Sequence, residues 1–251
     1  MSPEVRPLPR TPVDVLFLYP DRVWPITGGG PARLFALVEH LRAEGLRVGL
    51  VTADHGGIYN AAITPRLDRV DFYRARRQVV KRWFHRLPAP MQRVVRRGES
   101  FAQKRLRRLR RGESAQPGSF LASKVDGAFN AFAAACAQAS GARAVIAVFA
   151  WSAPALANLP PGVLRLVDTI DVQHQRREKA QAAGYDLPQR ACTREEEIAA
   201  LAHGEVLLAI QAEEGETFRA MLPGKRVIVV EHAVPEQRRQ PAPPSARDIL
   251  Y

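Results

Sequence analysis

The sequence alternates between short apolar runs and longer segments of helical periodicity, and this alternation limits the possible folds more than any other feature. The runs VDVLFLY at 13–19 and RVGLVTA at 47–53 are short and almost wholly apolar, which is typical of strands buried on both faces of a parallel sheet. Between them, a helix is predicted from about Pro31 to Gly45, because apolar side chains recur there at helical spacing, at Leu34, Leu37, Val38 and Leu41. Strand, helix and strand form a βαβ unit.

The same alternation continues through the second half of the sequence. Further strands are predicted at 71–75, 142–150, 162–171, 205–211 and 225–234, and further helices at 119–140, 193–202 and 213–222. The helix at 193–202 opens with Thr193 and Glu196, which have the spacing of a capping box. The order of these segments predicts an α/β fold, a Rossmann-like doubly wound parallel sheet.

The net charge of +12 is concentrated in one segment. Between Arg74 and Arg111 there are fifteen Lys or Arg residues and one acid, Glu99, so this segment carries +14 and the rest of the chain −2. Apolar residues such as Trp83 and Phe84 are interleaved with the cations, so we interpret 74–118 as a basic helical insertion that lies on an anionic membrane surface. Nucleic acid is a second interpretation, weakened by the lack of a recognisable binding module, and a solvated helical face is a third.

Other parts of the composition limit the compartment and the cofactors. No apolar run reaches the length of a bilayer span, and the first residues lack the apolar centre of a secretory signal, so we expect a cytoplasmic protein, peripheral on the inner face of the membrane if the basic segment binds there. The two cysteines, Cys136 and Cys192, are expected to be reduced thiols. The six histidines do not fall at metal-ligand spacing, and no metal is predicted.

Three consecutive glycines, Gly28, Gly29 and Gly30, separate the first predicted strand from the first helix. A glycine there requires either unusual backbone dihedrals or a close neighbour that leaves no room for a Cβ. The spacing is not that of the dinucleotide fingerprint, although Asp54 after the second strand could pass for its acid. Backbone amides at a helix N-terminus suit an anion, and a tight turn without a ligand is the alternative.

Polar residues follow the strand predicted at 162–171, at the end where open α/β sheets bind ligands. Asp168, Asp171 and His174 are therefore candidates for a binding or catalytic site. The alternative is that one of the two aspartates caps the next helix. Arg176 and Arg177 follow at once, and they would either meet a phosphate or lie on an exposed helix face.

Several separated motifs resemble one known family. The stretch TGGGPARLFALVEHLRAEGLRVGLVTAD is similar to the N-terminal signature of the family 4-like glycosyltransferases, which has a glycine-rich loop, an Arg on the first helix and a second strand ending in V-T. The stretches LVDTIDV and TREEEIAALAHGEVLLAIQAEE resemble that family's D-T-H-D-V and E-E-x-x-L-x-x-A-D-x-V-x-A-I-Q-x-x-E, and EHAV resembles its H-G-V. The resemblance covers about residues 13 to 235.

The resemblance implies a GT-B architecture of two domains, in which the N-terminal domain receives the acceptor and the C-terminal domain binds a nucleotide-sugar, without an obligatory metal. Residues 1–235 would be the N-terminal Rossmann-like domain, and 236–251 the linker and the start of the C-terminal domain. The partners would be a nucleotide-sugar donor, which is a substrate and not a cofactor, and a glycan or lipid-linked acceptor, as in cell-surface polysaccharide synthesis. The chain alone would be inactive.

The resemblance also assigns roles to residues. Gly28, Gly29, Gly30 and Arg33 would approach the donor's diphosphate or the transferred sugar, and Asp171 and His174 would be the catalytic residues. Ile170 departs from the family, which has His at this position, and Ala233 replaces the Gly of H-G-V. The family's donor-binding pair E-x7-E belongs to its C-terminal domain, so we treat the same spacing at Glu197, Glu205 and Glu213 as a coincidence.

The same residues also fit a protein that is not an enzyme. The alternative is a non-enzymatic Rossmann-like binding module that uses the segment Arg74–Arg111 on a membrane or on nucleic acid.

Overall fold

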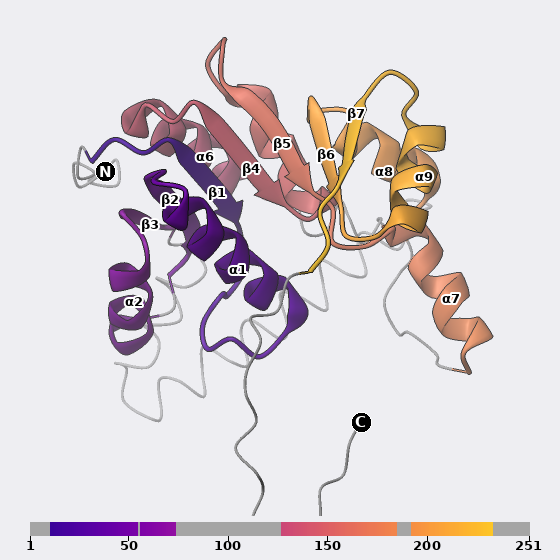
Figure 1. Cartoon of the computed structure of the whole chain (residues 1–251), viewed down its shortest axis with the longest axis horizontal. Helices are drawn as coiled ribbons and strands as arrows, with labels where there is room; N and C mark the ends of the chain where they lie inside the picture. The colour runs from indigo at the N-terminus through magenta and orange to yellow at the C-terminus, as the bar shows by residue number, and fades with distance from the viewer. Residues whose placement is uncertain (1–10, 55, 74–126, 185–191, 233–251) are drawn as a thin grey trace, which may run out of the picture.

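The computed structural model describes residues 11–54, 56–73, 127–184 and 192–232. These residues form one seven-stranded sheet in the order β3-β2-β1-β4-β5-β6-β7, and every neighbouring pair of strands is parallel. Helices flank the sheet (Figure 1). The predicted α/β, Rossmann-like doubly wound fold is confirmed.

Each predicted strand is present, and all except β3 have shorter bounds than predicted. The strands are β1 (Val15–Tyr19), β2 (Val48–Ala53), β3 (Arg69–Tyr73), β4 (Ala144–Val148), β5 (Leu164–Asp168), β6 (Val206–Ala209) and β7 (Arg226–Val229). All residues of β1 and β2 are buried, as expected of central strands covered on both faces. The strand β3 begins two residues before the predicted start, because its pairing with β2 begins at Arg69, opposite Gly49. Its two charged residues pair with each other: Arg69 Nε lies 2.6 Å from Asp71 Oδ2, and both side chains are buried.

The predicted helices are also present. They are α1 (Gly29–Ala43), α6 (Gly127–Ser140), α8 (Arg194–Leu201) and α9 (Ala212–Met221). The capping box of α8 is confirmed, since Thr193 Oγ1 accepts from Glu196 N and Glu196 Oε2 accepts from Thr193 N. The structure also contains short elements that the sequence pattern did not predict, namely α2 (Gly57–Ile63), η1 (Thr64–Arg66), η2 (Ala150–Asn158), η3 (Gln173–Gln175) and α7 (Arg176–Ala182).

Two apolar cores lie on the two faces of the sheet. On one face, Leu34 and Val38 of α1 pack with Phe17 and Leu50 of the central strands. On the other face, the core includes residues of α6, η2, α8 and α9, among them Phe129, Cys136, Leu156, Leu201 and Phe218. The helices therefore cover both faces, and the ends of the strands are the places where polar side chains and ligands can gather.

Two predictions fall outside the described residues: the basic helical insertion at 74–118 and the linker at 236–251. They stay predictions. Among the helices that the structure describes, none is long and apolar enough to cross a bilayer.

Candidate functional site

The strand order reverses between β1 and β4, which are neighbours in the sheet although two further strands separate them in the sequence. From β1 the chain builds outward through β2 to β3, and from β4 it builds outward the other way. Open α/β sheets bind ligands outside the carboxyl ends of the strands at such a reversal. Of the glycines predicted as a binding loop, Gly28 precedes α1, and Gly29 and Gly30 are the first two residues of α1, so the triplet lies at this point.

The glycine triplet is not a left-handed turn. Gly28 is extended, with φ −153°, and none of the three glycines has a positive φ. The helix α1 begins at Gly29, two residues before the predicted start, and Pro31 is tolerated because the first turn of a helix leaves its N–H groups unpaired in any case. The helix has no side-chain cap and no acid in its first turn, so its N-terminus keeps its preference for an anion.

The close neighbour of the triplet is Phe149, the residue that follows β4. A Cβ on Gly30 would lie 2.8 Å from Phe149 Cζ and 3.2 Å from the hydroxyl oxygen of Tyr19, whereas a Cβ on Gly28 or Gly29 would meet no atom within 4 Å. Packing therefore explains the third glycine alone. The other two glycines have open space where a Cβ would lie.

Two residues at the ends of neighbouring strands have strained backbones. Phe149 follows β4 with φ 69°, and Ile170 lies two residues after β5 with φ 60°. Positive φ is rare for a bulky or β-branched side chain and costs about 1–3 kcal/mol, so the surrounding structure must hold it. The Phe149 ring stacks on Trp151 at 4.1 Å and packs edge-on against Tyr19 at 5.8 Å. Strain of this kind concentrates at ligand sites.

A buried ion pair connects the two motifs that were predicted separately. Arg33 Nε lies 2.9 Å from Asp168 Oδ1 and 3.0 Å from Oδ2, and Nη2 lies 2.9 Å from Oδ1, with both side chains almost fully buried. Burial raises the pKa of Asp168 to about 6, against the opposing charge and hydrogen bonds of Arg33. Asp168 is thus an ion-pair partner rather than a helix cap, and contact of Arg33 with a ligand stays a prediction.

Asp171 lies in the turn that follows β5, half-buried, with Oδ2 3.6 Å from Arg176 Nε. Burial raises its pKa, and the charge of Glu197 adds to this effect. Glu214, in the first turn of α9, also has a raised pKa because of burial and the charge of Asp171. Within the described part of the chain, Glu214 Oε2 is buried without a hydrogen-bond partner. The catalytic role of Asp171 stays a prediction.

His174 lies in η3 and contacts a carboxylate that the sequence analysis had set aside. Its Nδ1 is 2.7 Å from Oε2 of Glu197, and Glu197 is fully buried on α8. The sequence does hold a signal for this residue: Glu197, Ala200 and Leu201 have the spacing of one helical face, and all three are buried. A carboxylate on an otherwise apolar helix face needs a partner in the interior.

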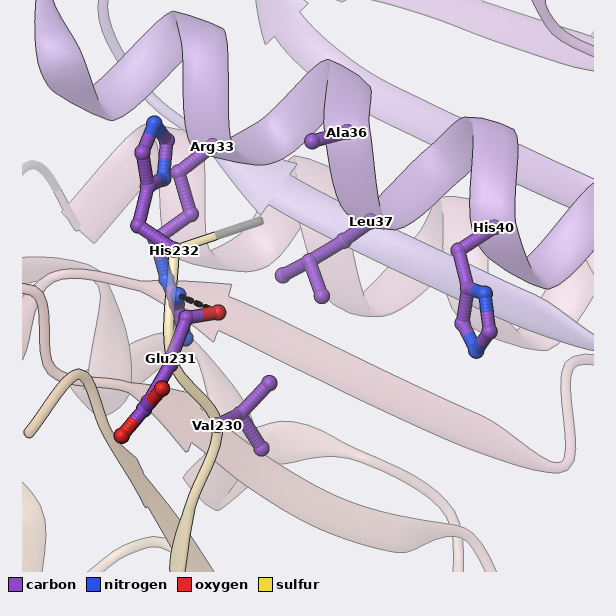
Figure 2. A pocket seen from close by; sticks show the side chains of 7 residues that line it. All are labelled: Arg33, Ala36, Leu37, His40, Val230, Glu231 and His232. Atoms are coloured by element: carbon purple, nitrogen blue, oxygen red, sulfur yellow. Dashed lines mark hydrogen bonds between the residues drawn. The ribbon is translucent and has the colours of Figure 1, made fainter. Parts of the chain in front are cut away.

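A pocket of about 230 Å³ lies between α1 and the chain that leaves β7. Figure 2 shows Arg33, Ala36, Leu37 and His40 on α1 facing residues Val230, Glu231 and His232. Arg33 Nη1 donates to the Glu231 carbonyl oxygen at 3.3 Å, so the residue that binds Asp168 also holds this segment against α1. His232, the first residue of the motif compared with H-G-V, is thus placed beside the glycine-loop helix.

Three other predictions concern single side chains. Asp54 Oδ1 accepts from Gly56 N at 2.9 Å and from Asn60 Nδ2 at 2.8 Å, so its carboxylate holds the start of α2. Cys136 and Cys192 are free and buried, as expected, and burial raises the pKa of Cys192 to about 12. In the ranges that the structure describes, no group of three or more His, Cys, Asp or Glu side chains is placed to hold a metal ion.

In comparisons with known proteins, no family model matches this chain and no curated protein matches it. The fold class therefore rests on the structure itself.

Proposed function

We propose that this chain contains the N-terminal, acceptor-side domain of a family 4-like glycosyltransferase of GT-B architecture. The whole enzyme would transfer a sugar from a nucleotide-sugar to a glycan or lipid-linked acceptor. One observation supports this above the others: the Arg of the glycine-loop helix and the first Asp of the D-T-x-D motif, 135 residues apart, form one buried ion pair. Two of the motifs on which the resemblance depends are thus in direct contact.

The charges at the carboxyl ends of the strands support a division of this site into two halves. The N-terminus of α1, with open backbone at Gly28 and Gly29, favours an anion and would face the donor's diphosphate. The carboxylates of Asp171 and Glu214 would repel a diphosphate, but they accept hydrogen bonds from hydroxyl groups. The acceptor sugar would therefore bind near Asp171 and His174.

Donor binding offers one test of this proposal. The described residues form one Rossmann-like unit, and the family binds its donor through a second domain. In calorimetry with UDP- and GDP-sugars we therefore expect weak or no binding by the 251-residue protein, and no turnover. Micromolar binding of a nucleotide-sugar by this protein alone would contradict the acceptor-side assignment.

Acceptor binding offers the complementary test. We expect oligosaccharides or lipid-linked sugars to give saturation-transfer signals in NMR with this protein, and Asp171→Asn to weaken them. Glu205→Gln is the matched control. Glu205 lies at the amino end of β6, whereas Asp171 follows the carboxyl end of β5, and Glu205 pairs with Arg165 at 3.3 Å. An equal effect of the two variants would show that the signals do not come from the proposed site.

A further inference from the structure

The carboxylate of Glu197 binds three groups of the segment that follows β5. Its Oε1 accepts from the backbone N–H of Gln173 at 2.9 Å, and its Oε2 accepts from the backbone N–H of His174 at 2.9 Å. The same Oε2 lies 2.7 Å from Nδ1 of the His174 ring. A single buried side chain on α8 therefore fixes both the backbone of η3 and the ring of its histidine.

These contacts determine which of the two side chains donates the hydrogen bond between His174 Nδ1 and Glu197 Oε2. Two backbone amides donate to the two carboxylate oxygens, so each oxygen already acts as a hydrogen-bond acceptor. An ionised carboxylate can only accept hydrogen bonds, so His174 Nδ1 must be the donor. The neutral ring then carries its proton on Nδ1, and Nε2 keeps a free lone pair.

The second ring nitrogen of His174, Nε2, does not contact Glu197. Among the described residues, His174 Nε2 has no hydrogen-bond partner, and the side chain keeps 16% of its surface exposed. His174 lies three residues after Asp171, in the turn that was assigned to the acceptor. A histidine whose inner nitrogen binds a buried carboxylate and whose outer nitrogen is open has the arrangement of a general base.

We propose that Glu197 is a positioning residue that holds His174 as the Nδ1–H tautomer, so that Nε2 is the proton acceptor of this site. The identity of the proton donor rests on the proposed function: it would be the acceptor hydroxyl. As the hydroxyl oxygen bonds to the anomeric carbon of the donor sugar, the nucleoside diphosphate leaves with the electron pair of the broken C–O bond. The hydroxyl proton passes to Nε2 and from there to solvent.

The tautomer can be measured on the 251-residue protein without any ligand. Long-range ¹H–¹⁵N correlation spectra of the imidazole rings separate protonated from unprotonated nitrogens, and the signals of His174 are identified by their loss in His174→Gln. At a pH where the ring is neutral, we expect Nδ1 to be protonated and Nε2 unprotonated, by about tenfold or more. A ring protonated on Nε2 would overturn the proposal, and this result needs no folded variant of Glu197.

Two variants then test the cause. Glu197→Gln replaces the accept-only group by an amide, so we expect the preference for the Nδ1–H tautomer to fall at least about tenfold. Glu205→Gln is the matched control, because Glu205 lies at the amino end of β6 and pairs with Arg165 at 3.3 Å, and it should leave the tautomer unchanged. An unchanged tautomer in a folded Glu197→Gln protein would also overturn the proposal.

Addition of an acceptor separates this inference from the proposed function. An oligosaccharide that binds as proposed should shift the ¹⁵N signal of His174 Nε2 and leave that of Nδ1 nearly unchanged. If the tautomer is as expected and no oligosaccharide moves the Nε2 signal, the positioning of His174 by Glu197 stands and the acceptor assignment fails. If oligosaccharides bind and the tautomer is wrong, the acceptor site stands and the positioning role fails.

Discussion

Replacing Arg33 by Met should destabilise the protein by an amount that depends on pH. The substitution retains most of the apolar volume but removes the guanidinium that binds both oxygens of Asp168. The two side chains are 3% and 0% exposed, so the remaining carboxylate cannot be rehydrated without local unfolding. Loss of one partner of a buried pair costs about 3–5 kcal/mol, which corresponds to a fall of roughly 6–20 °C in melting temperature for a protein of this size.

The pKa of Asp168 sets the pH dependence. In the folded protein this pKa is about 6, above the ordinary value of 3.8, and loss of Arg33 raises it further because Arg33 lowers it. At a pH between 3.8 and the pKa of the folded protein, the folded state holds a proton at Asp168 that the unfolded chain has released. The free energy of unfolding therefore falls as pH rises through this window, and the window is wider in the variant. The cost of Arg33→Met should therefore be larger at pH 8 than at pH 5, where the carboxyl is largely protonated in both proteins.

Urea titrations followed by far-UV circular dichroism at pH 5 and pH 8 measure this difference. Arg47→Met is the matched control, because Arg47 pairs with Asp14 at 3.2 Å but is 51% exposed, so solvent screens this pair and its loss should cost far less than that of Arg33 at either pH. The double variant with Asp168→Asn should recover about 2–3 kcal/mol of the loss at pH 8. A pH-independent loss, or a double variant no more stable than Arg33→Met, would refute the reasoning.

Two further predictions concern the glycine triplet and the basic segment. Gly30→Ala should cost about 1–3 kcal/mol in urea titrations, because its Cβ would lie 2.8 Å from Phe149 Cζ, whereas Gly29→Ala should stay within about 0.5 kcal/mol; equal losses would contradict the packing explanation. The segment Arg74–Arg111 should bind anionic vesicles in a sedimentation assay and release them when the six cations of Lys104–Arg111 are replaced by Gln. Tight nucleic-acid binding without vesicle association would favour the alternative partner.

The sequence alone predicted the features that depend on neighbours along the chain. The central strands β1 and β2 were visible because each is a short apolar run, and burial on both faces leaves no alternation to obscure it. The capping box at Thr193 and Glu196 was visible because its hydrogen bonds join residues only three positions apart. The short helices α2 and α7 were missed because seven residues carry too little periodicity to detect.

Only the tertiary structure decided which residues share the candidate site. The pairing of β1 with β4 brings Phe149 against Gly30 and places the end of β5 close enough for Asp168 to bind Arg33. No local pattern encodes these contacts, because the residues are more than a hundred positions apart and an Arg or Asp looks the same in sequence whether it is paired or solvated. The same holds for Glu197: its residue type was visible, but the burial and the histidine that make it a positioning residue come from the packing of α8 against η3.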